Sequence, residues 1–341
     1  MNRKVFTVVI LCFISVSVII LCTFLGAADI SAKDVIIILL NKIFGLFDSK
    51  VQNLGTKASI IWQLRFPRTL LAFIVGGSLA MCGGVYQAIF KNPMADPYIL
   101  GISSGAAFGA TIAMFFKFSN TLLGTNAVSI MAFVCGVGTI FLVYNIARVG
   151  KSAHLTSLLL TGTAFSQFLT AIISLIMMLS ANEMRKIYFW TLGSFSSKGW
   201  EHVITVLPYA VIGSALIIMY CRDLDIIMLG DDSAIRFGVE TEKVKRNLFF
   251  ITALVMAACV SVSGIIGFVG LIAPHVVRLF SGPMHKRLLP LSFLTGGVLL
   301  TVCDSIARTV MDSEIPVGIV TAIIGAPFFV YLLRSKRNEV M

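Results

Sequence analysis

Long apolar runs separated by short polar segments dominate this sequence. The first run extends from Val5 to Ala28, whereas a secretory signal has an apolar core of about 7–15 residues, so a retained first helix is predicted. Nine further apolar segments follow, near 66–90, 99–116, 127–147, 155–179, 203–220, 248–269, 274–283, 288–307 and 316–333. Since about 20 apolar residues cross a bilayer as a helix, the pattern predicts an all-α, polytopic membrane protein of about ten transmembrane helices.

The polar segments between these spans also have local structure. Ser31 and Asp34 resemble a capping box that opens a short helix beginning near Val35, which we place on the outer surface. Two prolines between Lys91 and Pro97 break any helix there. The stretch 182–200 is polar, and 222–246 is the longest charged stretch.

Composition agrees with the pattern of spans. Hydrophobic residues make up 57% of the 341 residues and charged residues only 13%, where a soluble domain carries roughly 25% charged residues. Soluble, disordered and disulfide-scaffold classes are therefore excluded. The continuous apolar runs also argue against a β-barrel, whose strands alternate. The whole chain, residues 1–341, is predicted to form a single transmembrane domain.

The net charge of +11 reflects topology rather than nucleic-acid binding, since the basic residues flank the apolar runs. With ten spans, both termini lie on one side, which receives sixteen of the 27 Lys and Arg residues. The positive-inside rule makes that side cytoplasmic. The seven cysteines form no CxxC pair and lie almost all in apolar runs, so no metal site is predicted.

Signatures of catalysis are missing from the sequence. It contains no HExxH, and Gly150-Lys151-Ser152 lacks the upstream glycine of a phosphate loop, because Asn145 takes that place. No catalytic residue is therefore predicted. Asp304 comes nearest to mid-membrane depth, and its spacing from Arg308 suits an i,i+4 salt bridge. A Gly-rich helix followed by a proline-broken stretch occurs after both span two and span seven, which suggests a weak inverted repeat.

Two polar features suggest contacts with partner proteins. Arg65 and Arg68 share a helix face at the outer mouth of span two, and Arg308 ends span nine on the same side. They either snorkel to the interface or dock acidic groups of a partner. On the cytoplasmic side, Ile235 and Phe237 lie in a Gly-bounded segment that could form two short helices and contact a cytoplasmic partner.

Several motifs, in order, resemble the FecCD family, the membrane-spanning subunits of type II ABC importers for ferric siderophores, haem and cobalamin. The resemblance covers nearly the whole chain, with Met94 and Phe237 where the family usually has Leu. It is carried by Trp62–Arg68, Gln87 with Asn92–Gly101, Trp190–Ser194, Leu229–Gly238, Gly267–His275 and Glu314–Phe329.

This resemblance implies a type II ABC importer permease fold and a role for particular residues. Arg65, Arg68 and Arg308 are expected to dock the binding protein. Asn92, Met94, Thr156 and Ser157 are expected at the cytoplasmic gate. The expected ATPase contact consists of Leu229, Gly230, Ala234, Ile235, Phe237 and Gly238.

The resemblance also implies partners and a location. We expect a second permease subunit, identical or a sibling, two cytoplasmic ATPase subunits and an extracytoplasmic substrate-binding protein, in the cytoplasmic (inner or plasma) membrane. ATP and Mg would be bound by the ATPase, and no cofactor is expected in this chain. Ferric siderophore is the first substrate hypothesis, followed by haem, cobalamin and an oxyanion such as molybdate. A secondary active transporter and an integral membrane enzyme are the alternatives of other classes.

Overall fold

A computed structural model describes residues 3–26, 28, 30–45, 54–118, 127–149, 152–311 and 313–340 of the chain. The first half contains α1 (Arg3–Phe24), α2 (Ala32–Phe44), α4 (Gly55–Ser59), the π-helix η1 (Ile60–Arg65), α5 (Phe66–Ile89), the 3-10 turn η2 (Pro97–Leu100), α6 (Ile102–Phe115) and α7 (Ala127–Ala147). Two-residue strands, β1 (Arg148–Val149) and β2 (Ser152–Ala153), form an antiparallel hairpin. The second half contains α8 (Leu155–Leu179), α9 (Ala181–Thr191), α10 (Trp200–Met219), α11 (Cys221–Ile227), α12 (Asp231–Arg236), α13 (Thr241–Ser263), α14 (Val269–Ser281), α15 (His285–Thr309) and α16 (Val317–Val340).

The helices confirm the predicted all-α membrane fold. In the described part of the chain, seven helical stretches are long and apolar enough to cross a membrane: Thr7–Phe24, Gly55–Ile89, Ala127–Ala147, Leu155–Leu179, Trp200–Met219, Thr241–Ser263 and His285–Thr309. Three shorter apolar helices are Ile102–Phe115, Val269–Ser281 and Val317–Leu332. These ten coincide in order with the ten predicted spans. The inverted repeat stays a prediction.

The polar stretch 182–200 contains a helix that the pattern of spans did not predict. In α9, Lys186 pairs with Glu183 one turn away at 2.9 Å, and Ile187 is buried in a cluster with Ala107 and Ile173. Arg185 and Lys186 are exposed, whereas Glu183 is buried beside Ile187. Because charged residues accompany a narrow apolar face, the segment resembles a loop in composition.

The predicted boundary between spans seven and eight is wrong. α13 ends at Ser263 because Gly264 adopts a left-handed φ of 69°. α14 then begins at Val269, so Pro274 lies inside it rather than at its start. Pro274 has no N–H to donate to the carbonyl of Gly270. That carbonyl instead faces Gly83 of α5.

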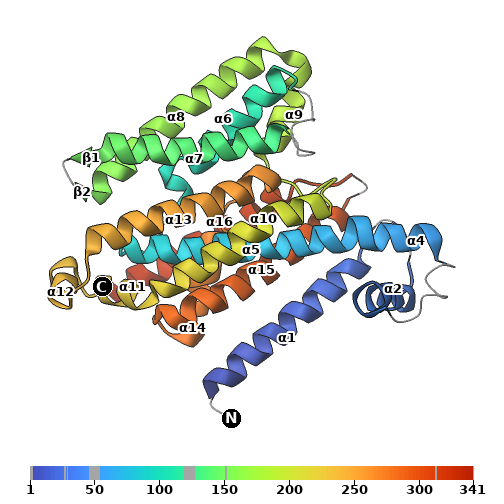
Figure 1. The fold of residues 1–341 in the computed structure, drawn as a ribbon, viewed down its shortest axis with the longest axis horizontal. Helices are drawn as coiled ribbons and strands as arrows, with labels where there is room; N and C mark the ends of the chain where they lie inside the picture. Colours follow the sequence, from blue (N-terminus) through green and yellow to red (C-terminus); the bar gives the residue numbers. More distant parts are fainter. Residues whose placement is uncertain are drawn as a thin grey trace.

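α5 forms the centre of the bundle (Figure 1). Of its 24 residues, 22 are buried, and it packs against α10, α13, α14 and α15. Glycines permit the closest approaches, since a Cβ at Gly83 would meet backbone atoms of Gly270, and one at Gly76 would meet those of Gly296. The small residues read from the sequence therefore serve backbone-to-backbone packing.

The other helices lie on either side of this centre. α6 and α7 pack on α13, and α8 covers them, which gives the upper layer of Figure 1. α1 packs on α15 and α5 at the opposite edge. The short helix α2 packs on η1 through Val35, Ile38 and Ile61. Its predicted cap is confirmed, because the Ser31 hydroxyl accepts a hydrogen bond from Asp34 N at 3.2 Å.

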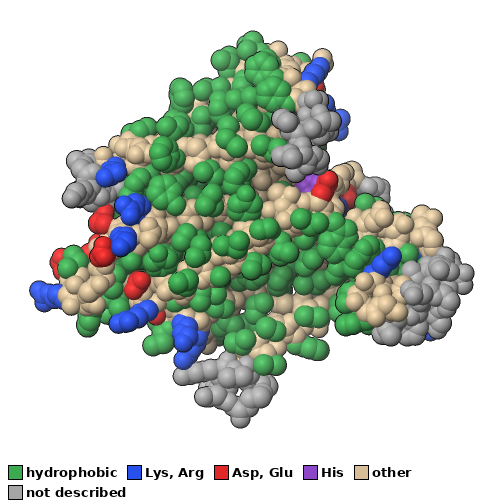
Figure 2. All heavy atoms as spheres, viewed as in Figure 1, with side chains coloured by type: hydrophobic (Ala, Val, Ile, Leu, Met, Phe, Trp, Pro, Cys, Tyr) green, Lys and Arg blue, Asp and Glu red, His purple; other side chains and the backbone are tan. Residues whose placement is uncertain are grey.

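The two ends of the bundle differ in chemistry. We call the end that holds Arg65, Arg68 and Arg308 the arginine end, and the end that holds α11 and α12 the α12 end. α1 ends and α16 begins at the arginine end, so the start of α1 and the end of α16 lie toward the α12 end. Figure 2 shows a broad hydrophobic belt between the ends and charged side chains gathered beside α11 and α12. This distribution is that of a membrane-spanning protein.

The contact between α5 and α14 can be tested with matched glycine substitutions. Gly83→Ala places a Cβ against the backbone of α14, and we expect it to lower stability by about 1–3 kcal/mol, as overpacking does. Gly138→Ala on α7 meets no atom within 4 Å and should be neutral or stabilising. Thermal unfolding of the purified proteins in detergent measures both. Equal melting temperatures would show that α14 yields without cost.

Candidate functional site

The arginine end is organised by an irregular turn of helix. In η1 the N–H of Phe66 donates to the carbonyl of Ile61, five residues back, and regular α-helix resumes at α5. The indole of Trp200 donates to the carbonyl of Trp62 at 2.7 Å. Trp62, Phe66 and Trp200 form an aromatic cluster with ring centroids 5.0–5.7 Å apart. This turn sets the direction of Arg65 relative to Arg68.

Arg68 joins three segments of the chain. Its Nε and Nη2 donate to the carboxylate of Asp304 on α15, at 2.9–3.2 Å. Its Nη1 donates to Glu314, in the loop before α16, at 2.8 Å. Asp304 is 1% exposed, so its charge is compensated by a planar guanidinium in a buried site, the geometry in which Arg–carboxylate pairs are strongest.

Arg65 and Arg308 bind the end of α1. Arg65 donates to the carbonyls of Phe24 at 2.9 Å and Ala28 at 2.5 Å. Arg308 donates to the carbonyl of Cys22. The last carbonyls of a helix lack intrahelical donors and carry the negative end of its dipole. The two arginines therefore cap α1.

These positions confirm one expectation and correct another. Arg308 does join Arg68, because both contact Asp304, although the Arg308 Nε lies 4.0 Å from that carboxylate and Arg68 is the closer partner. Snorkelling and docking both lead us to expect exposed guanidinium groups, but Arg65, Arg68 and Arg308 are only 6–9% exposed. Sequence spacing could not reveal this, since their acceptors lie on α1, α15 and the loop before α16. The docking role stays a prediction.

Glu314 is the exposed member of this cluster. Its side chain is 43% exposed, and partial burial raises its pKa. Hydrogen bonds from Arg68 and Ser196, with the charges of Arg68 and Arg308, lower it more, so the pKa lies below its usual range. Glu314 is therefore ionised at neutral pH. The sequence offered only its place in the motif Glu314–Gly318 as a signal.

The predicted coupling residues lie on α12 and in the turns that flank it. α11 ends at Ile227 and α12 begins at Asp231, after Gly230 with φ of 115°. Ala234 is fully buried, while Ile235 and Phe237 are 62% and 65% exposed. Leu229 is likewise exposed, and Gly238, with φ of 79°, follows Phe237. The exposed apolar side chains are present, but the segment 229–238 contains one short helix rather than the two that were suggested, because α11 ends before Leu229.

The predicted gate residues occupy a tight turn after α5 and the start of α8. The side chain of Asn92 accepts a hydrogen bond from Met94 N at 2.9 Å. Asn92 is exposed and Met94 half-buried. Thr156 and Ser157 lie in the first turn of α8, which packs on η2. Within the described residues, no hydrogen bond joins the two pairs, and α8 meets η2 at Gly162, beyond its first turn.

One residue at the α12 end escaped the sequence analysis. Asp231, the first residue of α12, pairs with Lys91 at 3.0 Å and with Lys245 at 2.8 Å. Burial raises the pKa of Asp231 and hydrogen bonds from both lysines lower it, with a net lowering. An Asp after a glycine reads as an ordinary start of a helix, so no pattern identified it.

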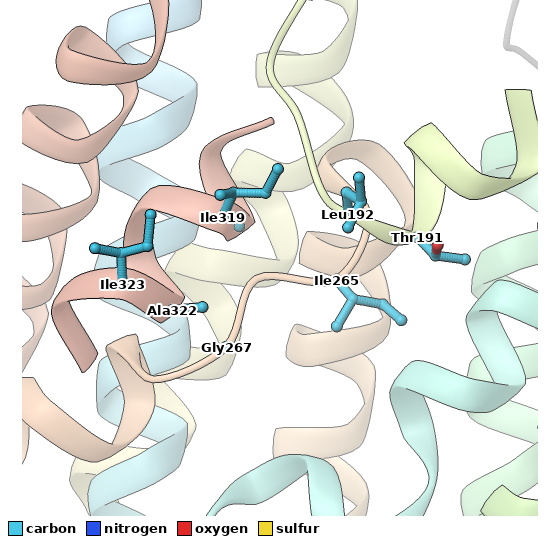
Figure 3. Close-up of a pocket in the computed structure, with 8 residues that line it drawn as sticks. Thr191, Leu192, Ile265, Gly267, Ile319, Ala322 and Ile323 are labelled. Atoms are coloured by element: carbon cyan, nitrogen blue, oxygen red, sulfur yellow. The ribbon is translucent and has the colours of Figure 1, made fainter. Parts of the chain in front are cut away.

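An apolar pocket of about 500 Å³ lies where α9, α16 and the linker between α13 and α14 meet. Figure 3 shows Ile319, Ala322 and Ile323 of α16 facing this space, with Leu192 and Ile265 across from them. The remaining lining residues are Thr191, Gly267 and Gly318. An apolar lining of this kind favours many weak van der Waals contacts with a bound molecule.

Among the described residues, no group of three or more His, Cys, Asp or Glu could hold a metal ion.

Comparisons with known proteins agree over nearly the whole chain. The FecCD transport family matches residues 11–335. The chain is 43% identical over 286 residues to the cobalamin import system permease protein BtuC of Halobacterium salinarum, covering 84% of this chain and 76% of that protein. It is 36% identical over 316 residues to the Fe(3+)-citrate import system permease protein YfmD of Bacillus subtilis, covering 92% and 90%. A solved structure of an inward-facing ABC transporter of the metal-chelate type superposes with a TM-score of 0.82 and 32% identity, covering 95% of this chain and 97% of that one.

Because Arg68 and Asp304 form a buried ion pair, we expect removal of Arg68 to lower the stability of the protein strongly. Arg68→Met leaves the buried Asp304 with only the distant Arg308 as a partner, and loss of one partner of a buried pair costs about 3–5 kcal/mol. Lys57→Met is the matched control, since Lys57 pairs with Asp34 in a half-exposed site, where a pair contributes below about 1 kcal/mol. Melting temperatures in detergent separate the two. The double variant Arg68→Met, Asp304→Leu should recover part of the loss, and equal effects of Arg68→Met and Lys57→Met would contradict the assignment.

Proposed function

This chain belongs to the FecCD transport family, the membrane permeases of ABC importers, and we propose that it carries an iron–siderophore complex across the cytoplasmic membrane by alternating access. The observation that carries the proposal is the match with importer permeases over residues 11–335. Family membership decides against a secondary carrier and against a membrane enzyme.

The pocket and the relatives support a chelate as the substrate. The pocket lining contains no charged residue, so it would hold a large chelate by dispersion contacts and release it readily. Relatives include permeases for Fe(3+)-citrate and a hemin transport system permease protein, HmuU, of Yersinia pestis at 35% identity. The chemistry common to these cargoes is a metal enclosed by an organic chelator.

Cobalamin is the second candidate, because a specific observation favours it. The identity to the cobalamin permease is 43%, against 36% for the Fe(3+)-citrate permease. Both cargoes are self-contained chelates, and an uncharged pocket suits either. Haem remains an alternative within the same class.

A second permease subunit, identical or a sibling, would complete the pathway. α8 and α16 expose large apolar side chains, including Met178 at 83% and Ile323 at 68%. Ile323 also lines the pocket. A partner subunit over this face would enclose the pocket and bury those side chains.

The α12 end is the proposed contact with an ATPase subunit, and the complex would contain two such subunits on its cytoplasmic side. Ile235 and Phe237 are exposed apolar side chains on a segment otherwise rich in charge, and a groove on the ATPase would bury them. ATP and Mg bind to that partner. On this assignment the α12 end and both termini are cytoplasmic, which the bias of basic residues supports.

Docking of an extracytoplasmic binding protein is proposed at the arginine end. The three arginines Arg65, Arg68 and Arg308 already donate hydrogen bonds to acceptors within this chain. A carboxylate of the binding protein would therefore have to replace one of these acceptors. Glu314 is the most accessible of these acceptors, at 43% exposure. Exchange of Glu314 for a partner carboxylate on Arg68 would preserve charge compensation throughout docking.

The gate is proposed at Asn92 and Met94, together with Thr156 and Ser157. Asn92 is exposed in the turn after α5, and Thr156 is exposed in the first turn of α8. A shift of the turn after α5 would act on α8 through η2, which packs on that helix.

Uptake measurements test the substrate. A strain lacking this chain should lose uptake of a radiolabelled ferric siderophore, and plasmid-borne wild type should restore it. Radiolabelled haemin and cyanocobalamin serve as parallel probes in the same strains. Unchanged siderophore uptake with loss of cyanocobalamin uptake would replace the first candidate by the second.

Co-purification tests the ATPase contact. Ile235→Asp or Phe237→Asp would bury a carboxylate in an apolar contact, at a cost of several kcal/mol, so we expect inserted permease that no longer retains the ATPase. Ile235→Leu and Phe237→Leu keep the apolar contact and should retain it. Wild-type recovery of the ATPase with both Asp variants would remove α12 from the interface.

A further inference from the structure

A single carboxylate ties three segments together at the α12 end. Asp231 Oδ1 lies 3.0 Å from Lys91 Nζ, and Asp231 Oδ2 lies 2.8 Å from Lys245 Nζ. Lys91 follows the last turn of α5, and Lys245 lies in the second turn of α13. Each oxygen of the carboxylate therefore holds a different helix. Figure 2 shows acidic and basic side chains together at this edge of the molecule.

The backbone at Lys91 is unusual for a lysine. Its φ is 48°, in the left-handed region, where glycine or asparagine normally ends a helix. Its N–H donates to Ala88 O at 3.1 Å, and Asn92 N donates to Gln87 O at 3.0 Å, which closes α5. A glycine would close this helix with less strain. The closing turn therefore gives no reason for a lysine, whereas the ion pair with Asp231 does.

The second ion pair, between Asp231 and Lys245, involves a buried lysine. The side chain of Lys245 is 8% exposed, and a buried ammonium requires a charged or hydrogen-bonding partner. Asp231 supplies it, which fixes the start of α12 against α13. The ion pair between Asp231 and Lys91 is more exposed, at 34% for the Lys91 side chain and 44% for that of Asp231. The carboxylate of Asp231 is therefore fixed on α13 and also binds the residue that follows α5.

The Asp231–Lys91 ion pair connects the two parts that must move together in the proposed mechanism, which are α12 and the turn Asn92–Met94. Asp231 is the first residue of α12, which carries Ile235 and is followed by Phe237, and Lys91 directly precedes Asn92. α11 also packs on α5 through apolar side chains. α12 itself reaches the end of α5 through the Asp231–Lys91 pair.

We propose that Asp231 is a positioning residue that transmits movement of α12 to the turn Asn92–Met94. The inference rests on the proposed function, in which α12 contacts the ATPase and this turn forms the gate. A displacement of α12 pulls the carboxylate, the carboxylate pulls Lys91, and the turn that follows Lys91 changes its position. Without the Asp231–Lys91 pair, the ATPase still binds Ile235 and Phe237, but the turn Asn92–Met94 no longer moves with α12.

The test uses the complex of this chain with its ATPase in proteoliposomes. Met94→Cys serves as the reporter, and labelling with a maleimide dye is compared with and without ATP and vanadate. The protein that lacks the added cysteine corrects for the native thiols. With Asp231 intact, labelling should depend on nucleotide. Asp231→Asn should reduce this dependence roughly five-fold or more, the lower end of typical coupling between sites, while the ATPase still co-purifies.

Three further variants separate coupling from stability. Lys91→Gly removes the ion pair and relaxes the backbone, so it should preserve thermal stability yet lose the nucleotide dependence. Combined with Asp231→Asn, it should cause no further loss, because both remove the same interaction. Asp232→Asn is the matched control: Asp232 is exposed on the same helix and removal of its charge should leave the dependence intact.

The outcomes distinguish two kinds of failure. If labelling of Met94→Cys ignores nucleotide even with Asp231 present, the proposed gate is wrong and the inference falls with it. If labelling responds to nucleotide and the response survives both Asp231→Asn and Lys91→Gly, the inference alone is overturned. An equal loss in Asp232→Asn would also overturn it, because the effect would then come from charge on α12 rather than from the pair.

Discussion

The close packing of α5 is the constraint on which the rest of the structure depends. α5 is buried along almost its whole length because glycines let the backbones of α14 and α15 approach it. Its 24 residues give a rod of about 36 Å. The rod begins beside Arg68, at the proposed docking end, and ends beside Lys91, at the proposed ATPase end. Both sites are therefore mounted on one element that cannot bend without breaking its contacts.

Charge compensation shapes the two ends of this rod differently. At the arginine end the guanidinium groups are buried, so each requires acceptors, and these come from α1, α15 and the loop before α16. At the α12 end Asp231 and Lys91 are half-exposed, so solvent screens their pair, whereas Lys245 is buried and holds Asp231 on α13. The first arrangement favours a fixed geometry. The second leaves one pair at the surface, where α12 and the turn after α5 can change position together.

Sequence reasoning was most successful where a pattern is local. Apolar run lengths predicted the ten spans, and the exposed Ile235 and Phe237 followed from a Gly-bounded polar segment. It was less successful where partners are distant in sequence. Arg68 and Asp304 are separated by 236 residues, and no periodicity relates them. α9 was missed because its apolar face is narrow, and the burial of Arg65 depends on a π-helical turn without a sequence signature.

The positions of the glycines and charges together indicate how such a bundle can transmit motion. A helix packed backbone to backbone moves as a rigid unit, since packed cores have discrete arrangements rather than continuous ones. Movement must then be absorbed where helices end. The turn after α5 meets this condition, because Lys91 already has an uncommon backbone conformation and Asn92 is exposed. The loop before α16 meets it at the other end, where the half-exposed Glu314 pairs with Arg68 and α16 lines the apolar pocket. Alternating access would thus arise from two hinged ends around a rigid centre.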